Sequence, residues 1–241
     1  MQTNRILWPA LKLVTAVWMA AAGYAIFFVA PDEKTMHELQ RIFYIHVASA
    51  WTAYLAFFVV GLAGVLYLTQ RKPQHEWLGV AAAETGLAFT TIVLTTGPIW
   101  AKPAWGIWWT WDARLTTTFV LWLMYIAYLL IRNLVEEPAR RAVVSAAYGI
   151  FAFVDVPINY FAIRWWRTQH PSPVIGGGQG SGLDPVMLKV LLFTLGAVTL
   201  LFAVLVHTRY RLEALRYEVE LLRQDAEEPT GARAALRLQE N

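Results

Sequence analysis

The sequence predicts an all-α, polytopic membrane protein with six transmembrane helices. Of its 241 residues, 57% are hydrophobic and 15% are charged, and the mean hydropathy is +0.43. This is more apolar surface than a soluble core of this size can hide. The hydrophobic residues also gather in separate stretches of about the 20 residues that a helix needs to cross a bilayer. Together these observations indicate a membrane bundle.

The predicted spans follow the apolar stretches in chain order. The first is longer than the core of a signal peptide, so we expect it to be retained as a membrane anchor. The fourth is the shortest. The six spans are 8–29, 42–68, 78–100, 116–131, 142–163 and 186–206.

The orientation follows from the Lys and Arg residues in the connections. They are more frequent before span one and after spans two, four and six than in the other connections, and such an excess marks the cytoplasmic side. We therefore expect both termini in the cytoplasm, and the connections after spans three and five on the outer side.

Two domains are predicted, a six-span domain at 1–208 and a cytoplasmic helix with a disordered tail at 209–241. The helix carries a narrow apolar seam, which either docks a partner subunit or belongs to a solvated extension of span six. The tail, from Asp225 onward, is polar and contains Pro229 and Gly231. The seam consists of Leu212, Leu215, Val219 and Leu222.

The composition excludes several classes of function. The chain has no cysteine, which excludes disulfides, thiolate metal sites and covalent attachment of a c-type haem to this chain. No basic patch is interleaved with aromatic residues, so nucleic-acid binding is excluded. The glycine run at 176–182 lacks the Lys-Ser/Thr ending of a phosphate-binding loop and is interpreted as a linker or lid.

The connection after span three contains four of the twelve tryptophans, beside an acid and a base. Interpreted as a short amphipathic helix on the outer surface, it places Trp105, Trp108, Trp109 and Asp112 on one stripe. Such an aromatic wall suits a large planar ligand. The alternative is a belt of tryptophans at the membrane interface, where this residue is common.

Two histidines share the side of the tryptophans. His46 lies inside span two near its outer end, where an ionisable residue is a functional candidate or a core histidine bonded to a neighbouring helix. His170 lies in the outward loop before Pro171 and, taken alone, is a surface histidine. Together they form the pair needed to ligate haem iron on both faces. His37, also outward, is a competing candidate.

Haem carries two propionates, for which Arg41 and Arg114 are the candidate partners. Each Arg has an equally good alternative as an interfacial anchor that reaches toward lipid head groups. Asp112 has three alternative roles: contact with the ligand, a pair with Arg114, or a cap of span four that accepts hydrogen bonds from N–H groups near Leu115 and Thr116. We favour the last two, structural roles over direct ligand contact. Asp155, Pro157 and Asn159 in span five either shape the haem cavity or satisfy one another between helices, and we favour the second, structural role.

The motif Trp-Gly-x-Trp-Trp-x-Trp-Asp at 105–112 resembles the signature of tryptophan-rich (WWD) haem-handling proteins of cytochrome c maturation. Together with Arg41, the Tyr44-Ile45-His46-Val47 stretch and His170-Pro171, it is similar to the haem exporter protein C (CcmC) family over nearly the whole chain. The charged extension after Val206 departs from the family pattern.

The resemblance implies a haem-binding and transfer protein of the bacterial cytoplasmic (inner) membrane, not an enzyme. Haem b would be held non-covalently and transiently at the outer, periplasmic face and delivered to the haem chaperone CcmE. ATP hydrolysis would reside in an ABC-type complex with CcmA, CcmB and CcmD. The implied haem contacts are His46 and His170 as iron ligands, Trp105, Trp108, Trp109 and Trp111 as the platform, and Arg41, Arg114 and Asp112 around it.

Two other classes fit less well. A membrane b-type cytochrome, acting as an electron-transfer subunit, predicts histidines buried between spans. A transporter permease subunit predicts polar residues near the bilayer midplane, where Glu84 is one of few.

Overall fold

The computed structural model describes residues 3–171 and 182–227. In this part of the chain, six helical segments are long and apolar enough to cross a membrane. The predicted all-α polytopic fold is therefore confirmed. The segments are Leu7–Val29, Glu38–Gln70, Pro73–Trp105, Ala113–Leu134, Pro138–Trp165 and Pro185–Gln224.

Several of these segments are built from more than one helical element. The first ends in a π-helical turn, η1, the second begins with a 3-10 turn, η2, and the fifth is divided at Val154. Pro157 has no N–H to continue the helical ladder, which accounts for the division and confirms the expected backbone break. The elements are α1 (Thr3–Tyr24), η1 (Ala25–Val29), η2 (Glu38–Gln40), α2 (Arg41–Gln70), α3 (Pro73–Trp105), α4 (Ala113–Leu134), α5 (Pro138–Phe153), α6 (Asp155–Trp165) and α7 (Pro185–Glu227).

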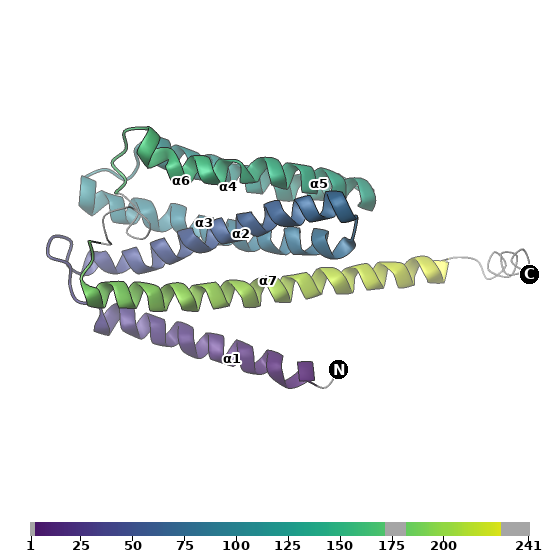
Figure 1. Ribbon diagram of the computed structural model, residues 1–241, viewed down its shortest axis with the longest axis horizontal. Coiled ribbons are helices and arrows are strands. Elements are labelled where there is room, and N and C mark those ends of the chain that lie inside the picture. The colour runs from purple at the N-terminus through teal and green to yellow at the C-terminus, as the bar shows by residue number, and fades with distance from the viewer. Residues whose placement is uncertain (1–2, 172–181, 228–241) are drawn as a thin grey trace, which may run out of the picture.

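Helices α2, α3, α4 and α5 form the centre of the bundle, in which each packs against the next and α5 returns to α2. Helix α7 covers α2 and α3, and α1 packs on the far side of α7 (Figure 1). Phe57 of α2 and Tyr125 of α4 stack in the middle of the core with ring centroids 3.6 Å apart. Aromatic stacking of this kind adds to the energy of apolar burial.

Glycines allow the central helices to approach closely. A Cβ on Gly86 would lie 2.6 Å from the Phe57 ring, and a Cβ on Gly64 would lie 2.7 Å from the carbonyl oxygen of Ala146. Since neither contact is sterically possible, α2 can pack this tightly against α3 and α5 only where glycine is present.

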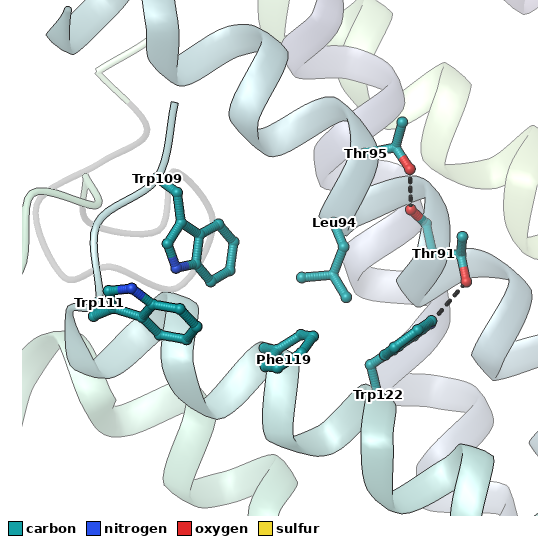
Figure 2. A pocket seen from close by; sticks show the side chains of 7 residues that line it. All are labelled: Thr91, Leu94, Thr95, Trp109, Trp111, Phe119 and Trp122. Carbon is teal, nitrogen blue, oxygen red and sulfur yellow. Dashed lines mark hydrogen bonds between the residues drawn. The ribbon is translucent and has the colours of Figure 1, made fainter. Parts of the chain in front are cut away.

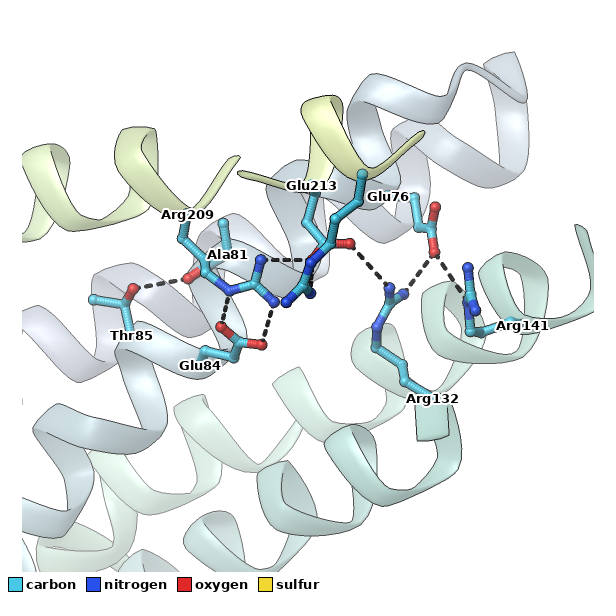
Figure 3. Close-up of polar contacts among 9 residues, drawn as sticks. Glu76, Ala81, Glu84, Thr85, Arg132, Arg141, Arg209 and Glu213 are labelled. Carbon is cyan, nitrogen blue, oxygen red and sulfur yellow. Dashed lines mark hydrogen bonds and ion pairs between the residues drawn. The ribbon is translucent and has the colours of Figure 1, made fainter. Parts of the chain in front are cut away.

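The two ends of the bundle differ in character. At the end that we call the tryptophan end, the 106–112 connection joins α3 to α4, and α2 and α7 also begin there (Figure 1). At the opposite end, which we call the ion-pair end, α7 is joined to α3 and α4 by charged side chains (Figure 3). Helix α1 begins and α7 finishes on that same side (Figure 1).

The ion-pair end is a network of buried and half-buried charges. Arg132 Nη1 lies 2.7 Å from Glu76 Oε1, and the two side chains are 9% and 13% exposed. Arg209 donates to both Glu84 and Glu213. Glu84, the polar residue that a permease interpretation would use, therefore has an ion-pair partner on α7.

The predicted helix over the tryptophan segment is wrong. Helix α3 continues past Pro103 to Trp105 and ends at Gly106, whose φ of +76° is left-handed and whose N–H donates to the Lys102 carbonyl at 2.9 Å. Helix α4 begins only after Asp112. A left-handed glycine ends a helix, and the few residues left before α4 are too short to form another.

The predicted boundary between 208 and 209 falls inside α7, which continues without a break to Glu227. The two-domain division stays a prediction. Of the predicted tail, Asp225–Glu227 is helical and 228–241 lies outside the described residues, as does 172–181 with most of the glycine run.

Candidate functional site

His46 projects from the first turns of α2 against α3 at the tryptophan end. It is buried, with 9% of its surface exposed. Its Nδ1 lies 2.9 Å from Thr96 Oγ1, and its ring lies 5.9 Å from that of Trp100. A Cβ at Gly97 would lie 3.3 Å from His46 Cε1. Three neighbouring positions on α3 therefore fix where this imidazole lies.

His170 lies in the connection after α6. Its Nδ1 is 2.9 Å from the carbonyl oxygen of Pro171. Because a carbonyl only accepts, Nδ1 must carry the proton, and Nε2 is left with a free lone pair in the neutral ring. Burial lowers the pKa of His170 below its ordinary value, and the positive charge of Arg114 lowers it further. The imidazole is therefore neutral near pH 7, the form that binds metals.

Both histidines lie at the tryptophan end. They are near enough for His170 to act electrostatically on His46 and for Arg114 to act on both. His37, the competing candidate, lies in a separate turn that closes when its backbone N–H donates to the Glu33 carbonyl at 3.0 Å.

Arg114 enters this group from the first turn of α4. Its Nη1 donates to the carbonyl oxygen of Asn159 at 2.5 Å, and its guanidinium lies 5.8 Å from the centroid of the Tyr54 ring. No carboxylate lies within ion-pair distance among the described residues. The Arg114 guanidinium is therefore held by a carbonyl and an aromatic ring, both neutral groups.

Asn159 of α6 holds Arg114 in place. Its Nδ2 donates to the Arg114 carbonyl at 3.2 Å and to the hydroxyls of Thr117 and Thr118 at 2.7 and 2.9 Å. Tyr54 donates to its Oδ1. Asn159, for which we favoured a structural role, thus joins α2, α4 and α6 next to Arg114.

Asp112 caps α4, as expected. Its Oδ1 accepts from the N–H groups of Arg114 at 3.0 Å and Leu115 at 3.1 Å, and its Oδ2 accepts from the Thr110 hydroxyl at 2.9 Å. No ion pair with the Arg114 guanidinium forms in the described structure, so the pairing alternative is wrong. The cap ends the irregular segment and starts α4 at a defined residue.

Arg41 joins α2 to the end of the first span. Its guanidinium donates to the carbonyls of Ile26, at 3.0 Å, and Phe27, and pairs with Asp32 at 3.2 Å. A cation at free carbonyls near a helix C-terminus is favourable. The structure thus gives Arg41 a fixed local role, and its contact with a propionate stays a prediction.

The tryptophans do not form the flat wall that the helical interpretation predicted. Trp109 and Trp111 meet at an interplanar angle of 78° with centroids 5.6 Å apart. Both line a hollow of about 410 Å³ between α3 and α4, and Figure 2 shows them on the side opposite Trp122. Trp105 and Trp108 do not line it, and Trp108 is 56% exposed. The remaining lining residues are Thr91, Leu94, Thr95, Phe119 and Trp122.

Sequence reasoning missed several residues of this region. Phe119 and Trp122 stack at an interplanar angle of 19° and extend the aromatic surface along α4. Their i, i+3 spacing directly after the tryptophan segment was the available signal. No comparable signal marked Thr96 and Gly97, because an isolated Thr-Gly pair inside an apolar span has no distinctive pattern.

His46 and His170 fit a metal ion that arrives with most of its ligands already bound. Within 3–171 and 182–227, no three His, Cys, Asp or Glu side chains gather as a metal-binding group. A porphyrin supplies four nitrogens to its iron, so the protein needs to supply only axial ligands. The imidazoles of His46 and His170, with the Arg114 guanidinium acting on both, match those needs.

Comparison with known proteins gives a consistent result. The family model described as Heme exporter protein C matches residues 1–225. The Heme exporter protein C of Bradyrhizobium diazoefficiens is 37% identical over 221 residues, which covers 91% of this chain and 83% of the relative. The Escherichia coli K12 protein of the same name is 33% identical over 208 residues, covering 84% and 82%. The Haemophilus influenzae protein is 30% identical, covering 92% and 87%.

Proposed function

The chain belongs to the haem exporter protein C family of cytochrome c biogenesis, and from this membership we propose that it carries haem b at its tryptophan end. The haem is bound non-covalently and transiently, with His46 and His170 as the axial ligands of the iron. The tryptophan end faces the periplasm and both termini face the cytoplasm of a bacterial inner membrane, as the distribution of Lys and Arg favours.

One observation carries the proposal. Two imidazoles from separate segments, α2 and the connection after α6, lie at the same end of the bundle, where the charge of Arg114 acts on both. Arg114 itself has no carboxylate partner among the described residues. In His170 the proton on Nδ1 is held by a carbonyl, the arrangement that prepares Nε2 for a metal. Arg114 supplies the charge-assisted hydrogen bonds that a propionate needs.

The aromatic segment supports the porphyrin from one side. Trp109 and Trp111 line the hollow, and Trp105 and Trp108 precede them in the same motif. Asp112 fixes the end of the aromatic segment, and Arg41 fixes the start of α2. We further expect Arg41 to contact the second propionate. The exposed Trp108 is suited to meet a partner that takes the haem.

That partner is the haem chaperone CcmE. Transfer, not catalysis, is the role of this chain. ATP hydrolysis belongs to the ABC-type partners CcmA and CcmB with the small subunit CcmD. The family membership supports this assignment, and the seam on α7 supplies a surface for such a complex: Leu212, Leu215, Val219 and Leu222 are each at least 43% exposed.

The ligands are tested by visible spectroscopy of the protein purified with haem. We expect His46→Ala and His170→Ala each to abolish the low-spin bands of a bis-imidazole haem. His207→Ala is the control, because His207 packs on Trp8 in α1, with ring centroids 4.0 Å apart, away from the site. A low-spin spectrum that survives either substitution overturns the ligand assignment.

The aromatic role is tested by the transfer of haem to purified chaperone. Trp108→Ala and Trp109→Ala should both slow chaperone loading, whereas Trp77→Ala at the other end of α3 should not. Loading at the normal rate in both site variants would reduce the segment to an interfacial anchor.

A further inference from the structure

We propose that Thr96 is a positioning residue for the iron ligand His46: its hydroxyl fixes the imidazole as the tautomer protonated on Nδ1 and aims Nε2 at the iron. This inference rests on the proposed function, because it assigns a partner to the ligand that the proposed function names. Thr96 lies in α3, outside the tryptophan motif at 105–112.

The Thr96 hydroxyl donates its proton within α3. Oγ1 lies 2.7 Å from the carbonyl oxygen of Ile92, one turn earlier in α3. Two oxygens at this distance repel each other unless a proton lies between them, and the carbonyl has none to give. The hydroxyl proton is therefore directed at Ile92.

His46 forms a hydrogen bond with the same hydroxyl. Its Nδ1 lies 2.9 Å from the same Oγ1, a hydrogen-bonding distance. Because the hydroxyl has already used its only proton, Nδ1 must be the donor in this contact. A neutral imidazole that donates from Nδ1 keeps its lone pair on Nε2. Nε2 has no hydrogen-bond partner among the described residues, so it is free to bind an ion.

Two neighbours on α3 orient the His46 ring. Gly97 lies under the imidazole, where a Cβ would come within 3.3 Å of Cε1, and Trp100 lies beside it with ring centroids 5.9 Å apart. The absence of a side chain at 97 lets the ring sit close enough to α3 for Nδ1 to reach Thr96. Thr96, Gly97 and Trp100 thus define both the position and the tautomer of His46.

The two ligands are prepared by different groups. His170 donates from Nδ1 to a backbone carbonyl, which no side-chain substitution removes. His46 donates to a side-chain hydroxyl, which Thr96→Val removes while keeping the shape of the residue. Hydrogen bonds of this kind raise the basicity of a ligating imidazole, and losing them costs about 10- to 100-fold in metal affinity.

The first experiment uses the full chain without haem. Labelling with ¹⁵N-histidine and NMR report which ring nitrogen of His46 carries the proton, with His46→Gln used to assign its signals. We expect the Nδ1-protonated form in the unaltered protein and in Thr96→Ser, and a shift toward the Nε2-protonated form in Thr96→Val. An unchanged tautomer in Thr96→Val overturns the proposal.

The second experiment uses the haem-loaded protein. Thr96→Val should weaken haem affinity about tenfold and raise the midpoint potential of the iron, because a less basic imidazole stabilises the ferric state less. Thr96→Ser should restore both. Thr90→Val is the matched control, since Thr90 is a buried threonine of α3 whose hydroxyl donates to Gly86 at 2.8 Å. Thr96→Val behaving like Thr90→Val contradicts the proposal.

The outcomes separate this inference from the proposed function. If His46→Ala keeps a low-spin haem, the ligand assignment itself is wrong. If His46→Ala loses the low-spin haem but Thr96→Val keeps the normal potential and affinity, only the role of Thr96 is wrong. The tautomer measurement needs no haem, so it remains decisive even where a variant loads poorly.

Discussion

The tryptophan end and the ion-pair end of the bundle handle charge in opposite ways. At the ion-pair end, Arg132 and Arg209 each meet carboxylates from other turns or helices. At the tryptophan end, Arg114 rests on a backbone carbonyl and an aromatic ring, with no carboxylate in ion-pair distance among the described residues. Arg132 and Arg209 are thus compensated within the fold, whereas Arg114 has no carboxylate partner in the described part of the chain.

The difference indicates which end is structural and which is for binding. A buried ion pair that is complete within the fold has no capacity for a ligand, and removing one partner leaves the other uncompensated. A cation held only by neutral groups can accept an anion without breaking an existing pair. The contrast predicts that substitutions at the ion-pair end change stability and that substitutions at the tryptophan end change binding.

The largest effect is expected at Arg132. Replacing it with Leu leaves Glu76, which is 13% exposed, without its close partner. We expect the free energy of unfolding to fall by about 3 kcal/mol, as for other buried pairs that lose one member. Unfolding of the haem-free protein in SDS–detergent mixtures, followed by circular dichroism, measures it.

The control for Arg132 is Arg216→Leu. Arg216 also pairs with Glu213 but is 61% exposed, so the change should stay below about 1 kcal/mol. Equal effects of the two substitutions would show that burial does not distinguish the pairs. A large loss of haem affinity in Arg132→Leu at retained stability would contradict the division between the two ends.

The next effect is expected at Arg114. Arg114→Leu removes a cation that has no carboxylate partner among the residues the structure describes, and we expect haem to bind about tenfold more weakly, equivalent to about 1.4 kcal/mol. Arg114→Lys should recover part of the loss because the charge remains although the paired geometry does not. Haem titration of the depleted protein measures both. Unchanged affinity in Arg114→Leu would mean that this Arg serves only the backbone of α6.

The smallest effect is expected at Asp112. Asp112→Ala removes the cap of α4 and should lower the free energy of unfolding by about 1 kcal/mol. Asp112→Asn keeps an acceptor and should remain close to the unaltered protein in both stability and haem affinity. If Asp112→Asn keeps its stability but loses haem affinity, the carboxylate contacts the ligand directly.

The features that the sequence predicts best are those that depend on local patterns. The six spans follow from runs of apolar residues, and the cap at Asp112 follows from a short acid placed before the apolar residues of span four. The break near Pro157 follows from its missing N–H. Each of these depends on neighbours in the chain, so no knowledge of the packing is needed.

The features that the sequence does not predict depend on partners far apart in the chain. The tryptophan stripe assumed a helix, but the left-handed Gly106 ends α3 before the stripe can form. The carbonyls of Ile26 and Phe27 that accept from Arg41 lie 15 and 14 residues before it in the chain, and no local pattern links them to it. Thr96 is 50 residues from His46, and only the packing of α3 on α2 brings them together.

Helix α7 has a mechanical consequence. Its 43 residues make an uninterrupted rod of about 64 Å, roughly twice the thickness of the hydrocarbon core of a bilayer. Beyond Arg209 the rod is still fastened to the bundle, because Tyr217 packs on Trp77 with ring centroids 5.4 Å apart and Glu213 lies 3.9 Å from Arg132. The same rod begins at the tryptophan end (Figure 1), so α7 is a stiff mechanical connection between the two ends of the bundle.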